Sequence, residues 1–116
     1  MRKMFFSFKN AFWGLWYVIK KESNFRLEIL AGVLVIGAMF LAGLERWEII
    51  ALIFVIFAVL ILEMLNTSVE RIVNMFKPRI HPYARIIKDI TAGAVLLASV
   101  GAVVVGLVIF WPYLFG

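Results

Sequence analysis

Three long apolar stretches dominate the pattern of this chain, and short charged segments separate them. They span residues 27–44, 47–66 and 88–111 approximately. Each is close to the roughly 20 residues that a helix needs to cross the hydrocarbon layer of a membrane. The pattern therefore predicts an all-α integral membrane protein with three transmembrane helices in one domain.

Residues 3–20 follow a different pattern, in which apolar side chains recur at helical spacing with polar side chains across from them. The segment lacks the small-residue cleavage site of a signal peptide. We expect an amphipathic helix that lies in the membrane interface. Packing of its apolar stripe against the protein's own spans is an alternative, and both can hold together. The stripe comprises Phe5, Phe8, Phe12, Leu15, Trp16 and Ile19.

Glycine, proline and small residues refine these boundaries. Gly43 and the charged turn after it end the first span, whereas no helix breaker occurs in the second helix before Pro78. We expect that helix to continue into the cytoplasm as far as residue 74, followed by a short loop that contains Pro78, His81 and Pro82. In the third span, small residues four apart predict close helix packing. These are Ala94, Ala98, Ala102 and Gly106.

Composition agrees with the membrane interpretation. Hydrophobic residues make up 65% of the 116 residues and charged residues only 16%, whereas soluble domains are nearer half apolar and a quarter charged. A chain this short cannot cover so much apolar surface by itself. It contains no cysteine, which excludes disulfides, thiolate metal sites and cysteine nucleophiles.

The net charge of +5 is unevenly placed. Of the 12 basic residues, 11 lie before the first span or between the second and third, and Arg46 is the exception. Three spans put both basic segments on the same side, which the positive-inside rule makes the cytoplasm. We therefore expect a cytoplasmic N-terminus, and we do not expect a nucleic-acid partner.

The second apolar run is too short for a full crossing. It is uninterrupted only from Ile49 to Leu62, which is 14 residues. A helix that crosses from Ile49 would therefore carry Glu63 and Asn66 to the inner edge of the hydrocarbon layer. A charge there costs up to about 2–3 kcal/mol, so such a residue is a functional-site hypothesis by default.

Four polar residues share one face of that second helix, because Glu63, Asn66, Glu70 and Asn74 lie at positions i, i+3, i+7 and i+11. Further charges reach the same cytoplasmic level from the other two spans. Carboxylates in excess of cations suit a hard divalent ion such as magnesium. A lysine beside them suits phosphate, and phosphoryl transfer needs little else. The additional charged residues are Glu22, Glu28, Lys88 and Asp89.

Two other interpretations of these charges remain open. A buried ion-pair network could join the three helices without doing chemistry. A small proton-coupled transporter could use Glu63, although transport sites favour the middle of the membrane. No glycine-rich phosphate loop of either common type occurs in the chain, so any nucleotide would be held another way.

Two sequence blocks resemble the signature of the bacterial diacylglycerol kinase and undecaprenol kinase family. Residues 63–70 read EMLNTSVE and residues 88–95 read KDITAGAV, and residues 22–26 match the family segment before the first span. The loop at His81 and the AGAV run are closer to the Gram-positive branch, whose members phosphorylate undecaprenol. The resemblance thus favours undecaprenol over diacylglycerol as the acceptor.

The resemblance also implies an assembly and a set of roles. It implies a homotrimer in the bacterial cytoplasmic membrane, with active sites between protomers at the cytoplasmic interface. Glu63 would be the general base and Asn66 would orient the base or the substrate. Glu22 and Glu70 would hold Mg²⁺ on the co-substrate ATP.

On the nucleotide side, the resemblance implies that Lys88 contacts phosphate. Asp89 would bind the nucleotide or position Lys88, and Asn74 would contribute its amide. Family members commonly carry aspartate where this chain has Asn74. The expected activity is an ATP-dependent transfer of phosphate to a lipid alcohol, without a covalent enzyme intermediate.

Overall fold

The computed structural model describes residues 2–76 and 82–116, and within them the chain is entirely helical apart from short turns. Helix α1 spans Arg2–Lys21, α2 Ser23–Ala42, α3 Arg46–Asn74 and α4 Pro82–Phe115. Three of these helices, α2, α3 and α4, are long and apolar enough to cross a membrane. The prediction of an all-α membrane protein with three spans and an N-terminal helix is confirmed.

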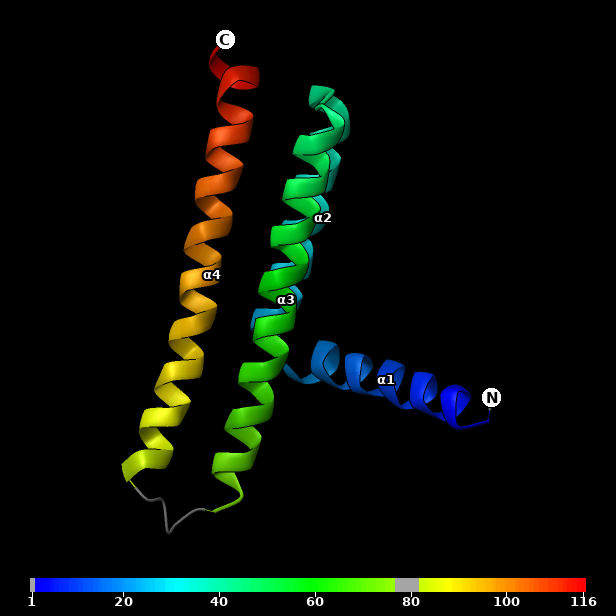
Figure 1. The fold of residues 1–116 in the computed structure, drawn as a ribbon, viewed down its shortest axis with the longest axis vertical. Helices are drawn as coiled ribbons and strands as arrows, with labels where there is room; N and C mark the ends of the chain where they lie inside the picture. The colour runs from blue at the N-terminus through cyan, green and yellow to red at the C-terminus, as the bar shows by residue number, and fades with distance from the viewer. Residues whose placement is uncertain (1, 77–81) are drawn as a thin grey trace.

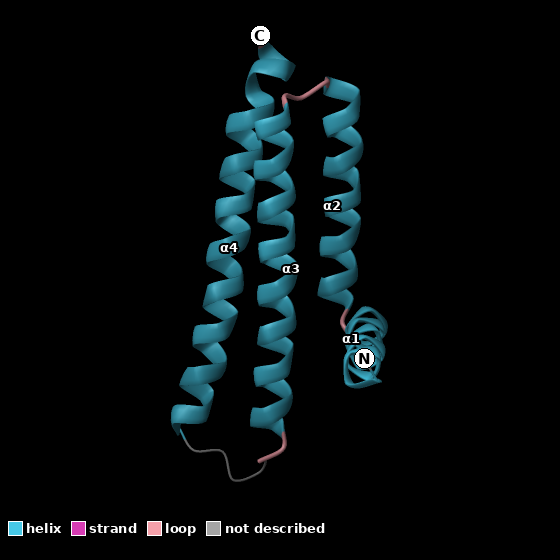
Figure 2. Cartoon of the chain, turned by 45° about the vertical axis from the view of Figure 1, so that its right-hand side comes forward, coloured by secondary structure: helices cyan, strands magenta, loops and turns pink. Residues whose placement is uncertain are grey.

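Helix α3 lies at the centre of the bundle, and α2 and α4 pack on different sides of it. The three helices run roughly side by side, whereas α1 projects away from them at a steep angle (Figure 1). The beginning of α2, the end of α3 and the beginning of α4 lie at one end of the bundle, beside α1 (Figure 2). The α2–α3 turn and the C-terminus lie at the other end.

The helix ends follow local sequence signals. Helix α2 ends at Ala42 because Gly43 adopts a left-handed conformation with φ of 69°, which glycine adopts without steric cost. Leu44, expected inside the span, therefore lies in the turn. Glu45 and Glu48 then form a reciprocal capping box that starts α3.

The end of α3 at Asn74 agrees with the expected extension of the second helix to residue 74. Pro82 was predicted to lie in the following loop, but it is the first residue of α4. Proline suits the first turn of a helix because its missing N–H has no partner there in any case. Pro78 and His81 lie outside the described residues.

Contacts within the chain are sparse for such apolar helices. In the most apolar 18-residue stretch of α4, only 6% is buried inside the chain. In the equivalent stretches of α2 and α3, 17% is buried. Backbone polar groups are satisfied within each helix, so lipid can cover the remaining surface. A small core lies at the end away from α1, formed by Met39, Leu44, Leu52 and Ile109.

A close approach of two helices occurs at Gly32, a glycine to which the sequence pattern assigned no packing role. A Cβ added to Gly32 of α2 would lie 3.1 Å from Cγ2 of Ile56 in α3. Gly106, part of the small-residue stripe expected to pack closely, has open space around it. Helix α4 packs on α3 more extensively than α2 does, so the open space at Gly106 is local.

Helix α1 keeps its phenylalanine and tryptophan side chains exposed, and Tyr17 is half-buried. Among its residues only Val18, near its C-terminal end, is buried. The Arg26 guanidinium donates hydrogen bonds to the carbonyl oxygens of Ile19 and Lys20, at 2.8 and 3.0 Å. These bonds satisfy carbonyl groups that the end of α1 leaves unpaired. The exposed stripe favours a helix on the membrane surface over one packed on the protein's own spans.

A buried carboxylate ties the far end of the bundle together. Glu48 accepts a hydrogen bond of 2.5 Å from the Tyr113 hydroxyl of α4 and one of 2.9 Å from the Glu45 backbone N–H. The Glu48 side chain is buried. The α2–α3 turn is thus joined to the C-terminal turn of α4.

We expect Tyr113→Phe to lower the stability of the folded protein by about 1–3 kcal/mol, because it leaves a buried carboxylate short of one donor. The measurement is reversible unfolding in mixed detergent micelles. Tyr17→Phe is the matched control, since Tyr17 contacts Trp13 and Arg71 through its ring. Equal stability of the Tyr113→Phe protein and the control would contradict the role assigned to the Glu48–Tyr113 bond.

Candidate functional site

The part of the polar face of α3 nearest the middle of the helix is buried, whereas Glu70 is half-buried and Asn74 is exposed. Glu63, Asn66 and Thr67 are 7%, 8% and 5% exposed. Such burial is unusual for a carboxylate, and it shows that this face points inward rather than toward lipid. The sequence predicted the shared face from spacing alone, and the structure places Glu63 and Asn66 inside it.

Glu63 lies beside a second carboxylate from α2. The carboxyl groups of Glu28 and Glu63 lie close enough to interact. The second oxygen of Glu28, Oε2, is buried and has no hydrogen-bond partner. An unpaired buried acceptor costs about 1–3 kcal/mol, so this oxygen marks a position where a donor from another molecule would be favourable.

Glu28 also lies at one end of a long apolar groove between α2, α3 and α4. The groove has a volume of about 610 Å³ and continues along the spans to Leu114. Among its lining residues, only Glu28 and Ser99 have polar side chains. Small residues, including Gly32, Ala102 and Gly106, keep it open. A chain-like apolar ligand fits such a groove, with its polar end at Glu28.

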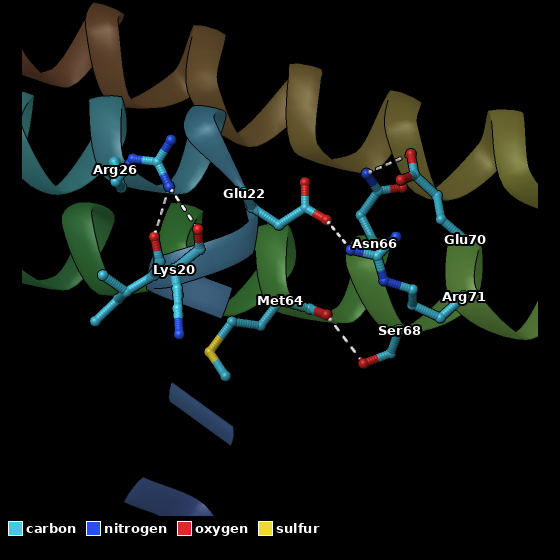
Figure 3. Close-up of polar contacts among 9 residues, drawn as sticks. Lys20, Glu22, Arg26, Met64, Asn66, Ser68, Glu70 and Arg71 are labelled. Atoms are coloured by element: carbon cyan, nitrogen blue, oxygen red, sulfur yellow. Dashed lines mark hydrogen bonds and ion pairs between the residues drawn. The ribbon is translucent and has the colours of Figure 1, made fainter. Parts of the chain in front are cut away.

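Asn66 connects α3 to α4. Its Oδ1 accepts a hydrogen bond of 2.8 Å from the Thr91 hydroxyl, and its Nδ2 lies 3.4 Å from Oε1 of Glu70. The Asn66–Glu70 contact is drawn in Figure 3. Since Glu70 lies one turn further from the membrane centre, the amide links the buried part of the face to its outer part.

Glu22 lies in the junction between α1 and α2, where its side chain is free of any helix-capping bond. Its Oε1 forms an ion pair of 2.8 Å with the guanidinium of Arg71 (Figure 3). That guanidinium also lies 5.9 Å from the centre of the Tyr17 ring, within the range of a cation–π contact. Arg71 therefore joins α1, the α1–α2 junction and α3.

Lys88 and Asp89 lie on the first turns of α4, where they line a second cavity of about 260 Å³ together with Val73 and Arg85. This cavity carries two cationic side chains and one carboxylate. Asn74 is exposed at the end of α3. The predicted residues thus fall into three neighbouring groups rather than one cluster.

The described part of the chain contains no group of three or more His, Asp or Glu side chains arranged to bind a metal. Glu22 contacts Arg71, whereas Glu70 contacts Asn66. Magnesium is commonly bound by only one or two carboxylates, with substrate phosphates and water completing its shell. The oxygen donors present therefore fit a magnesium ion that arrives together with a nucleotide.

Three residues of this region were not among the predicted site residues. Glu28 interrupts the start of an apolar run, a signal that was noted but given no role. Thr91 lies inside the KDITAGAV block, yet a threonine in a span usually bonds its own backbone. Arg71 was attributed to the basic segment that orients the chain.

The family model described as prokaryotic diacylglycerol kinase matches residues 9–110 of this chain. The match therefore includes the buried face of α3, the α1–α2 junction and the first turns of α4. The chain belongs to the prokaryotic diacylglycerol kinase family.

Individual relatives in this family carry two different names. The chain is 42% identical over 101 residues to a diacylglycerol kinase of Synechocystis, a match that covers 86% of this chain and 58% of that protein. It is 34% identical to the undecaprenol kinase of Bacillus subtilis, over 98% of this chain and 93% of that protein. A diacylglycerol kinase of Haemophilus influenzae is 32% identical over 90% of each chain.

Family membership identifies the chain as a multi-pass membrane lipid kinase, and it decides between the kinase and transporter interpretations. The names of the relatives leave the acceptor lipid open. The buried polar face of α3 is the natural candidate for the site of transfer, because it holds carboxylates where an apolar groove ends.

Proposed function

We propose that this chain transfers the γ-phosphate of ATP directly to the hydroxyl group of a membrane lipid, with undecaprenol as the preferred acceptor. The observation that carries this proposal is that the half-buried Glu28, at the end of the apolar groove, lies beside the buried Glu63. A lipid alcohol has an apolar chain and one polar end, and the groove offers the matching surfaces in the matching order.

The acceptor side of the reaction is assigned to the carboxyl pair. The lipid hydroxyl reaches the unpaired Oε2 of Glu28, and Glu63 takes the hydroxyl proton as general base. The hydroxyl oxygen forms a bond to the γ-phosphorus while the bond from that phosphorus to the β–γ bridging oxygen breaks, and ADP leaves. Burial of Glu63 excludes water, which would otherwise compete with the lipid as acceptor.

The nucleotide side is assigned to residues further from the membrane centre. Glu70 lies seven residues beyond Glu63, a rise of roughly 10 Å along the helix, which suits the distance from a lipid hydroxyl to a nucleotide phosphate. Lys88 binds phosphate and Asp89 binds the nucleotide or positions Lys88. The cavity that these two residues line with Arg85 supports this assignment. Asn74, exposed at the end of α3, contributes an amide contact to the nucleotide.

Magnesium on ATP is assigned to Glu22 and Glu70, and bound there it offsets the charge of the phosphate oxygens. Glu22 is already paired with Arg71, so its carboxylate has an alternative positive partner when no nucleotide is bound. That pair is partly exposed, and exposed pairs contribute only about 0–1 kcal/mol. Breaking the Glu22–Arg71 ion pair when a nucleotide binds therefore costs little.

The preference for undecaprenol rests on the polarity of the groove. Beyond Glu28, Ser99 is the only polar side chain among the lining residues. A polyprenol has no polar group below its hydroxyl, whereas diacylglycerol carries two ester groups that lose hydration when buried. The match to the undecaprenol kinase of Bacillus subtilis over nearly all of both chains points the same way.

Diacylglycerol is the second candidate acceptor. The higher identity, 42%, is to the Synechocystis protein named diacylglycerol kinase. In that case the ester groups would lie near the Glu28 end of the groove, close to the membrane surface and its water.

The same proposal includes a homotrimer with its N-terminus in the cytoplasm. The exposed apolar surface of α4 supports contacts with helices of other protomers, since so little of its most apolar stretch is buried within the chain. The clustering of basic residues in two segments supports a cytoplasmic position for α1 and for the acidic face.

To test the function, purified protein is given labelled ATP and Mg²⁺ with undecaprenol and diacylglycerol in parallel. We expect phosphorylation of undecaprenol to be faster, and we expect Glu63→Gln to lower the rate by about a hundredfold or more, as for loss of a general base. Glu45→Gln at the opposite end of the bundle is the matched control and should keep full activity. No transfer to either lipid by the wild-type protein would refute the proposal.

The groove is tested by filling it. Gly106 lines the groove, and a Cβ added to it would have no atom within 4 Å. Gly106→Leu should therefore fold normally and occupy the space of the lipid chain. We expect the KM for undecaprenol to rise severalfold and the KM for ATP to stay unchanged.

Gly101→Leu is the control for Gly106→Leu, because Gly101 lies on the same helix with equally open space and does not line the groove. Identical lipid KM values for the two variants would show that the chain of the acceptor lies elsewhere.

A further inference from the structure

We propose that Thr91 is a positioning residue that fixes the orientation of the Asn66 amide, so that the amide N–H is directed at Glu70. This inference rests on the proposed function, because it assigns to Asn66 and Glu70 the roles described above. The hydrogen bonds of three side chains and one backbone carbonyl carry it.

The Thr91 hydroxyl lies between two oxygen atoms. Oδ1 of Asn66 is 2.8 Å away and the backbone carbonyl oxygen of Lys88 is 2.9 Å away. A hydroxyl group has only one proton to donate. It can therefore serve only one of these acceptors at a time, and the surroundings decide which one.

The two acceptors differ in whether another donor is available to them. In a regular helix the carbonyl of Lys88 accepts the backbone N–H four residues later, so it has a partner without Thr91. Asn66 is only 8% exposed, and its Oδ1 faces Thr91. A buried amide oxygen without a donor costs about 1–3 kcal/mol. The proton of Thr91 therefore belongs to Asn66.

This bond settles which end of the amide faces the carboxylate. With Oδ1 held by Thr91, Nδ2 is the atom directed at Oε1 of Glu70, at 3.4 Å (Figure 3). The reversed amide would place Oδ1 against the Glu70 oxygen, and two acceptors would face each other. Thr91 thus controls whether Asn66 presents a donor or an acceptor to Glu70.

Thr91 acts on the reaction through Asn66 rather than by touching the reacting groups. Since it is placed on α4, three residues after Lys88, it also keeps the first turns of α4 in register with α3. A register effect and an orientation effect predict different behaviour of variants, so suitable substitutions separate them.

The test uses the full-length protein in detergent–lipid micelles and two variants of near-equal size. Thr91→Val keeps the shape of the side chain and removes the hydroxyl, whereas Thr91→Ser keeps the hydroxyl and removes the methyl group. We expect Thr91→Val to lower kcat roughly five- to tenfold, the effect of about one hydrogen bond, with KM for the lipid unchanged. Thr91→Ser should restore kcat.

A double-mutant cycle with Asn66→Ala identifies the route of the effect. If Thr91 acts through Asn66, adding Thr91→Val to Asn66→Ala causes no further loss, because the two changes remove one shared interaction. Additive losses in kcat would overturn the proposal and leave a role in helix register only.

A readout that does not depend on activity is the side-chain amide signal of Asn66 in ¹⁵N NMR spectra. We expect Thr91→Val to shift this signal and to speed its hydrogen exchange, and Thr91→Ser to preserve both. An unchanged Asn66 signal in Thr91→Val would overturn the proposal. Failure of the wild-type protein to phosphorylate any lipid would instead refute the proposed function, and the NMR result would still decide the role of Thr91.

Discussion

The structure depends on one constraint, which is that the carboxylate of Glu63 is buried inside a helix long and apolar enough to cross a membrane. An isolated carboxylate is costly in such a place. Glu28 lies beside Glu63, and two neighbouring carboxylates repel each other unless they share a proton or bind a cation. Further along the face, Asn66 connects Glu70 to Thr91. These side chains come from all three long helices, so the polar face of α3 also determines how the helices meet at the end beside α1.

The two ends of the bundle are held by different means. At the end away from α1, a compact apolar core and the Glu48–Tyr113 bond join the α2–α3 turn to α4. At the end beside α1, polar contacts of Asn66, Glu70 and Thr91 accompany a few buried apolar side chains such as Phe25, and an apolar groove runs between the two ends. A rigid far end with a polar, partly open near end suits an enzyme whose one substrate lies in the membrane and whose other substrate is in water.

Much of the fold could be predicted from the sequence, because membrane helices are specified by long apolar runs and by the charges that interrupt them. The length of the second run predicts that Glu63 lies near the hydrocarbon edge. The spacing of three residues between Glu63 and Asn66 predicted that both lie on the same face of α3. The turn at Gly43 and the end of α3 at residue 74 followed from local signals. Pro82 was misplaced because a proline can begin a helix as readily as it can interrupt one.

The candidate site was predicted less completely, since periodicity within one helix does not show which residues another helix brings to it. Glu28 and Thr91 acquire their importance only through contacts across helices. The Glu22–Arg71 pair joins residues 49 positions apart, which no local pattern reveals. The small residues of α4 predicted close helix packing, and α4 does pack extensively on α3, but the pattern did not show that Ala102 and Gly106 would also line a groove.

The central claim is that the polar face of α3 ends at the cytoplasmic edge of the membrane, with Glu70 nearer the water than Glu63. The chain has no cysteine, so single-cysteine variants report positions without interference. Membrane-impermeant maleimide is added to inside-out and right-side-out vesicles that contain Glu70→Cys, Leu65→Cys or Trp47→Cys. The account predicts labelling of Glu70→Cys only from the cytoplasmic face, slow labelling of the outward-facing Leu65→Cys, and labelling of Trp47→Cys only from the opposite face. Labelling of Glu70→Cys and Trp47→Cys from the same face would contradict it.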